Sequence, residues 1–303
     1  PHNASQADAY TYTFLALLWI LPIAGGYLSQ RCGYFSSASC GLIFCLFGIS
    51  CLSFSNQLSI ILFGLSCFLT GNALFTPSLW CLVDHIYHKE DQRRESGFTL
   101  FYLIFNLGCV AGIFCENQIK ATQGYPSAFL TCLVTLLITL SLLNRAKHQI
   151  EVAPNRCIKP QLSLSPTRIR STLYGSCGIS SIVVTLLFLN TTIATYLIYL
   201  ISLLAVIYLY HLAAQQRCSI QRQKVRGFLV LCLFAVAFWI LYNLESSLLS
   251  VFIANTVNRH VHIFGTSFLL PAESFFGFEG VSIVVIGLFF SYLWLHLAKK
   301  GKD

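Results

Sequence analysis

Charged residues are scarce in this sequence. They make up 10% of the chain, whereas hydrophobic residues make up 56%, and an ordinary soluble domain carries about 25% charged residues. A folded chain with so little charge would expose large apolar patches to water. The composition therefore predicts a protein that folds in a lipid bilayer.

Sequence signatures of several soluble classes are also missing. The 13 cysteines include no C-x-x-C pair, which argues against zinc ribbons and thioredoxin-like sites. No H-E-x-x-H, G-x-S-x-G, G-x-G-x-x-G or Walker loop occurs, so we expect neither an enzyme nor a bound cofactor. The first ten residues lack the basic start of a signal peptide. Methionine is absent altogether, and no physical property of the chain accounts for this.

Long apolar runs are abundant, and a membrane helix needs about 20 mostly apolar residues. The runs predict an all-α polytopic membrane protein with nine transmembrane helices. The predicted helices cover residues 9–28, 38–55, 58–84, 97–118, 127–144, 172–189, 192–213, 226–251 and 275–297.

The distribution of basic residues supports this number of helices. If the nine helices alternate in direction, Lys120 and Arg259 lie on one side of the membrane and the other 17 of the 19 Lys and Arg residues lie on the opposite side. Basic residues collect on the cytoplasmic side of membrane proteins. We therefore expect a multi-pass protein of the cell inner membrane with a cytoplasmic C-terminus. The net charge of +8 then reflects topology and not a nucleic-acid-binding surface.

Several stretches of the sequence resemble one family of membrane proteins. Residues 97–108 read G-F-T-L-F-Y-L-I-F-N-L-G, similar to the G-F-T-x-F-Y-x-x-x-N-x-G signature on the fifth helix of the proton-dependent oligopeptide transporters. Residues 71–77 read G-N-A-L-F-T-P and resemble the G-x-G-L-F-K-P motif on the fourth helix. The sequence thus looks like a member of this family, which is a branch of the major facilitator superfamily.

The resemblance implies a partial major facilitator bundle, because the family's first helix would lie before Pro1 and its last four after Asp303. It implies four regions along the chain. They are part of the N-terminal bundle with helices 2–6 of the family (1–145), a cytoplasmic linker (146–171), the helix pair that bacterial members insert (172–224) and the start of the C-terminal bundle with helices 7–8 (225–303).

The function implied by the resemblance is secondary transport of di- and tripeptides coupled to protons, which we expect to be incomplete in this chain alone. Three departures from the family pattern keep alternatives open. Thr76 stands where the family has a lysine. Where the family has an acidic or polar residue followed by Gln on the seventh helix, this chain has Asn243 followed by leucine. Glu279 stands where the family has Asn before Pro on the eighth helix. A diverged carrier of another small solute and a non-transporting, decayed membrane protein therefore remain alternatives.

Glu245 is the only acidic residue well inside a predicted membrane helix. An ionisable group there is unfavourable unless it is hydrated, paired or neutral, and is often functional. Glu245 could carry a proton or bind a peptide amine in a cavity that it shares with Asn243, Ser246 and Ser247. It could instead make a packing hydrogen bond, or lie protonated near the outer interface.

Other polar residues are candidates for the peptide site. The resemblance implies that Asn106 hydrogen-bonds the peptide backbone, with Tyr102 one turn earlier on the same helix face; a hydrogen bond between helices is the alternative. Thr76 could contact substrate or pack at the kink before Pro77, and Trp19 could line the cavity or serve packing.

Two further clusters have competing interpretations. Glu279 could pair with Arg259 or face the cavity. His85 and His88 are three residues apart and could share a helix face, but mixed charge is ordinary at a cytoplasmic helix end, so we expect no metal. The expected partners are small peptides, protons and the lipid bilayer, with no nucleic acid.

Overall fold

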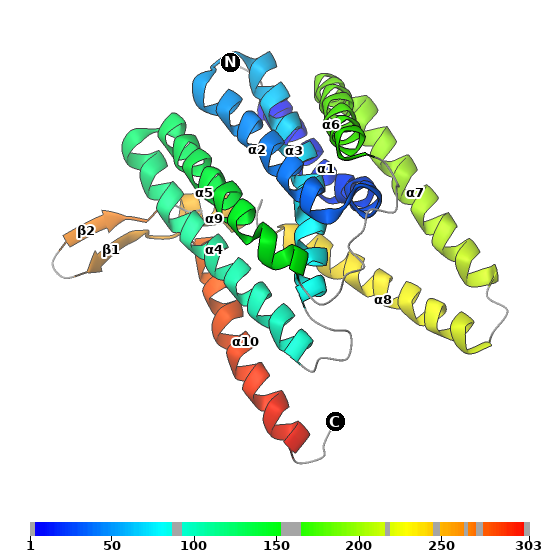
Figure 1. The fold of residues 1–303 in the computed structure, drawn as a ribbon. Helices are drawn as coiled ribbons and strands as arrows, with labels where there is room; N and C mark the ends of the chain where they lie inside the picture. Colours follow the sequence, from blue (N-terminus) through cyan, green and yellow to red (C-terminus); the bar gives the residue numbers. More distant parts are fainter. Residues whose placement is uncertain are drawn as a thin grey trace. The chain divides into compact units, whose positions relative to one another are not determined.

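The structure is a computed structural model, and all structural statements below concern the residues that it describes. These are residues 4–86, 93–152, 165–215, 219–244, 249–263, 266–270 and 275–299. The elements in chain order (Figure 1) are α1 (Ala4–Cys32), α2 (Tyr34–Phe54), α3 (Leu58–Ile86), α4 (Arg93–Gln123), α5 (Tyr125–Val152), α6 (Pro166–Leu189), α7 (Thr191–Gln215), α8 (Ser219–Leu244), α9 (Ser250–Thr256), β1 (His260–Ile263), β2 (Thr266–Leu269) and α10 (Phe275–Lys299).

The predicted all-helical membrane architecture is confirmed. Within the described residues, seven helices are long and apolar enough to cross a membrane, and they are α1 to α7. The last two predicted membrane helices fall on α8 and α10, whose apolar segments Gly227–Tyr242 and Gly280–Phe290 are shorter. Membrane crossing by these two helices therefore stays a prediction.

A small hairpin between α9 and α10 was not predicted from the sequence. Strands β1 and β2 pair antiparallel, with His260 opposite Leu269 and Ile263 opposite Thr266. Arg259 closes the open end of the hairpin, because its carbonyl accepts a hydrogen bond from the Leu270 N–H at 2.9 Å. Strands of four residues are too short for an alternating hydrophobic pattern to stand out.

The chain divides into two compact units, which are described separately. One unit holds residues 1–105 and 118–194, and the other holds residues 106–117 and 195–303. Helix α4 contributes to both units, α6 belongs to the first, and most of α7 to the second. The predicted domain boundaries at 145, 171 and 224 stay predictions.

Glycines bring α2 and α3 into close backbone contact within the first unit. A Cβ atom added at Gly41 would lie 2.5 Å from the carbonyl oxygen of Gly71, and one added at Gly48 would lie 2.5 Å from the carbonyl oxygen of Gly64. These glycines are spaced seven residues apart on both helices, which keeps them on one face of each helix. Small residues at helix interfaces are typical of membrane proteins, because lipid provides no hydrophobic force to hold helices together.

Helix α1 packs against α3 in the same manner. Pro77 has no N–H, so the carbonyl of Ala73 loses its partner inside α3, and this carbonyl lies directly against Gly25 of α1. Nearby, Ser78 donates a hydrogen bond of 2.9 Å to Ser29, whose hydroxyl donates to the Gly25 carbonyl at 2.7 Å. Close packing and a short polar chain together join the two helices.

The glycine contacts make a direct prediction about stability. The substitution Gly48→Leu would force the α2 and α3 backbones apart and lower the free energy of unfolding by about 1–3 kcal/mol, the usual effect of overpacking. The matched control is Gly175→Leu on α6, where an added Cβ meets nothing within 4 Å. Thermal unfolding in detergent compares them, and equal melting temperatures would contradict the packing described above.

Candidate functional site

Three of the predicted site residues lie in the first unit. Trp19 on α1 is 65% exposed and Tyr102 on α4 is 46% exposed, whereas Thr76 on α3 is partly buried. Large exposed side chains on a membrane helix face lipid, a cavity or another part of the bundle. Their role in lining a site stays a prediction.

An aromatic cluster aligns α3 and α4 near two of these residues. Trp80 on α3 stacks with Phe98 at a ring-centroid distance of 6.2 Å and meets Phe101 edge-on at 4.6 Å. Thr76 lies one turn before Trp80 on α3, and Tyr102 directly follows Phe101 on α4. The sequence analysis did not single out Trp80, although its place one turn after Thr76 was visible.

Thr76 has a hydrogen-bond partner on its own helix. Its hydroxyl donates to the side-chain oxygen of Asn72 at 2.9 Å, and the four-residue spacing places both on one face of α3. Asn72 was also missed from the sequence. A neutral hydroxyl–amide pair therefore occupies the position where the family motif has a lysine.

Asn106 lies in the second unit and is only 9% exposed. The start of α10 packs against this part of α4: a Cβ added at Gly280 would lie 3.7 Å from the Asn106 carbonyl oxygen and would collide with Val110. One turn earlier, a Cβ added at Gly277 would lie 2.6 Å from the Phe114 ring. Because the two glycines have no side chain, Phe114 and Val110 of α4 can pack directly against the backbone of α10.

Glu279 lies between Gly277 and Gly280 on α10, the helix that packs against α4 near Asn106. Its side chain lies outside the described residues. The proposed partner Arg259 donates to the carbonyls of Leu270 at 3.2 Å and Ala254 at 3.4 Å, and its pairing with Glu279 stays a prediction. Arg259 therefore has a structural role at the base of the hairpin, whatever further contact it makes.

The remaining candidates are Asn243, near the end of α8, and the three residues that follow Leu244 at positions 245–247. Glu245, Ser246 and Ser247 lie outside the described residues, and for Asn243 only the helical backbone is described. Just before it, Tyr242 packs against Phe238 and Trp239 at ring-centroid distances of 5.9 and 5.1 Å. The aromatic cluster gives this end of α8 a bulky face, but the role of the four polar residues stays a prediction.

Of the two histidines considered as metal ligands, the structure describes only His85. His85 packs edge-on against Tyr34 at a ring-centroid distance of 5.4 Å, whereas His88 lies outside the described residues. Among the side chains that the structure does describe, no group of three or more metal-ligating residues comes together.

Comparison with known proteins supports the family resemblance. Residues 36–303 match the POT family. The chain is 28% identical over 236 residues to "Dipeptide and tripeptide permease B" of Xenorhabdus bovienii, covering 77% of this chain and 46% of that protein. It is 23% identical over 303 residues to "Uncharacterized transporter YclF" of Bacillus subtilis, covering 98% of this chain and 61% of that protein.

Solved structures show the same fold. Tetrameric PepTSo2 superposes with a TM-score of 0.80 at 20% identity, over 97% of this chain and 64% of that one. A POT family transporter in complex with a thioalcohol-conjugated peptide superposes with a TM-score of 0.73 at 20% identity, over 97% and 62%. The chain thus spans about half to two-thirds of the length of the proteins that it matches.

The aromatic cluster at Trp80 predicts different effects for two phenylalanines of α4. Phe101→Ala removes the edge-on contact with Trp80 and is expected to lower the free energy of unfolding by about 1 kcal/mol, as for other aromatic pairs. Phe105→Ala is the matched control, because Phe105 is 56% exposed. Chemical or thermal unfolding of the two variants measures the difference, and an equal loss in both would mean that the cluster does not hold α4.

Proposed function

The chain belongs to the POT family, and on this premise we propose that it acts in proton-coupled transport of di- and tripeptides. The observation that supports this most is the family signature at residues 97–108, which includes a nearly buried Asn106. The permease of Xenorhabdus bovienii is named for dipeptides and tripeptides, and its name and those of the other relatives describe transporters and not enzymes. Because this chain spans less than two-thirds of those proteins, the activity is proposed for the full-length protein.

The chemistry of Asn106 suits a peptide ligand. Its amide offers both donors and acceptors, the same groups that a peptide bond presents. Transporters of this fold bind substrates near the membrane midplane, where few other polar groups compete. Tyr102, one turn away on α4, is the second residue that we propose for this site.

Proton coupling is assigned to Glu245 on the basis of the sequence. A carboxyl group in an apolar environment favours its neutral, protonated form. A substrate amine or an aqueous path would favour the charged form, so the group can release and regain a proton during a transport cycle. Asn243, Ser246 and Ser247 are proposed as its polar neighbours.

A second candidate function is transport of a small solute other than a peptide. The observation behind it is the hydrogen bond between Thr76 and Asn72, since a neutral pair cannot attract a carboxylate as the family's lysine would. Ligand-dependent thermal stabilisation separates the two candidates, because only a bound ligand raises the melting temperature. Stabilisation by dipeptides, but not by single amino acids or drugs, would argue against the second candidate.

Transport measurements test the peptide assignment. We expect inward proton gradients to drive uptake of a radiolabelled dipeptide into proteoliposomes that hold the full-length protein. Asn106→Ala should raise the KM about tenfold, the effect of one or two lost hydrogen bonds. Glu245→Gln should abolish the response to the gradient, because glutamine cannot exchange a proton.

The control for the acidic residue is Glu116→Gln near the end of α4, which should leave the gradient response intact. If Glu245→Gln kept the wild-type pH profile, the proton-carrier role would be wrong. If no dipeptide were transported or bound under any condition, the peptide assignment itself would fail.

The orientation proposed from the basic residues has its own test. Alkaline phosphatase is active only outside the cytoplasm, so a fusion after Gln123, at the turn between α4 and α5, should be active. A fusion after His148, near Arg145 and Lys147, should be inactive, because basic segments stay in the cytoplasm. The reverse pattern would invert the proposed topology.

A further inference from the structure

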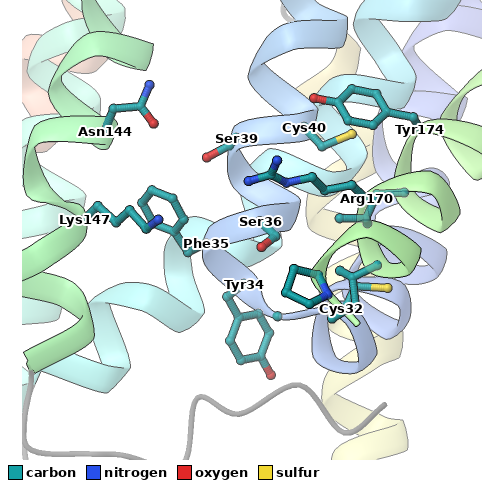
Figure 2. Close-up of a pocket in the computed structure, with 14 residues that line it drawn as sticks. Cys32, Tyr34, Phe35, Ser36, Ser39, Cys40, Asn144, Lys147, Arg170 and Tyr174 are labelled. Atoms are coloured by element: carbon teal, nitrogen blue, oxygen red, sulfur yellow. The ribbon is translucent and has the colours of Figure 1, made fainter. Parts of the chain in front are cut away.

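A polar cavity lies in the first unit where α2, α5 and α6 come together (Figure 2). Its volume is about 510 Å³. Its lining includes polar and charged side chains from all three helices, namely Ser36 and Ser39 of α2, Asn144 and Lys147 of α5, and Arg170 and Tyr174 of α6. None of these residues is among the candidates for the peptide site.

The cavity is positively charged. Figure 2 shows Lys147 extending from α5, with its amine 5.7 Å from the centre of the Phe35 ring, and Arg170 extending from α6. Among the lining residues in the part of the chain that the structure describes, none is acidic. An anion bound in this cavity would be attracted by both cations.

The start of α2 adds uncharged donors to the same wall. Gly33 caps this helix with φ 95° and ψ 131°, and no side chain caps the first turn. The N–H groups of a first helical turn have no partner inside the helix and favour anions. Residues 33–36 of that turn line the cavity.

A buried hydroxyl in the wall also has no partner. The Oγ atom of Ser39 is buried and makes no hydrogen bond with any described group, although buried hydroxyls are normally satisfied. Beside this hydroxyl, two cations and an uncapped helix start line one cavity, and this combination suits a phosphate-type oxyanion.

A second, apolar groove lies farther along α2 and α6, and Phe63 and Cys67 of α3 also line it. Its volume is about 380 Å³, and Tyr174 lines both spaces. On α2 the cavity ends at Cys40 and the groove begins at Ile43; on α6 the groove extends from Tyr174 to Ile182. From Ser36 to Phe47 the rise of an α-helix is about 16 Å, which matches a large part of an acyl chain.

We propose that the cavity and the groove together form a binding site for an anionic glycerophospholipid. The phosphodiester lies between Lys147 and Arg170 at the start of α2, and one acyl chain lies in the groove between α2 and α6. Basic pockets between membrane helices are known to suit such headgroups. The polar and apolar parts occur in the order that a phospholipid requires.

Binding of phosphatidylglycerol to the delipidated full-length protein in detergent tests the headgroup contacts. We expect a rise in melting temperature that saturates, as for a specific ligand. Lys147→Gln and Arg170→Gln should each weaken the apparent affinity about fivefold, and the double variant about 25-fold. The matched controls are Arg145→Gln and Arg168→Gln, which remove neighbouring cations that do not line the cavity and should leave the affinity unchanged.

The groove is tested separately with Gly178→Leu, which fills it, against Gly175→Leu outside it. An added Cβ meets nothing within 4 Å at either position, so both variants are expected to fold. Gly178→Leu should reduce binding of long-chain phosphatidylglycerol at least fivefold, and Gly175→Leu should not.

Three results would overturn the proposal. The first is wild-type affinity for phosphatidylglycerol in the double variant. The second is an equal response to phosphatidylcholine, which carries no net charge. The third is full stabilisation by inorganic phosphate alone, which would identify a site for a free anion and not for a lipid.

Discussion

Close backbone contact between α2 and α3 is the constraint on which the rest of the first unit depends. In lipid, burying leucine against leucine gains little, because the surroundings are equally apolar. Dispersion contacts between surfaces that fit closely must hold the helices together, and these contacts weaken steeply with distance. Gly41, Gly48, Gly64 and Gly71 provide the fit, since each lies where a Cβ atom would meet backbone.

Several residues of functional interest in the first unit lie on or against these two helices. Helix α3 carries Thr76 and Trp80, and Trp80 contacts Phe98 and Phe101 in the first part of α4. Helix α2 carries one wall of the basic cavity and of the groove beside it. Glycines also allow close packing in the second unit, where Gly277 and Gly280 of α10 contact Phe114 and Val110 of α4. Glycine in the place of the family's proline at position 280 is therefore explained by packing.

The membrane helices and the family signature could be predicted because both depend on local sequence. An apolar run of the right length has few other structures available in a chain of this composition, and the signature at residues 97–108 is dense. The hairpin, the Thr76–Asn72 hydrogen bond and the Trp80 cluster could not be predicted in the same way. Each depends on which side chains meet in space, and the sequence pattern alone offers several equivalent pairings. The division of α4 between two units is of the same kind, because nothing in its composition marks residue 106.

The distribution of charge connects the membrane fold with both proposals. The predicted topology collects most basic residues on one side of the membrane, whereas the described middle of α3 carries the neutral Thr76–Asn72 pair. A lysine at position 76 would have to be held by a counter-charge or by water in a cavity, whereas threonine needs only the oxygen of Asn72. With threonine at position 76, no counter-charge or water is needed there to stabilise a buried ammonium group. It also removes an attraction for carboxylates, so a peptide would be recognised here through hydrogen bonds more than through charge. At the headgroup level the opposite holds, because Lys147 and Arg170 concentrate positive charge where anionic lipids can neutralise it.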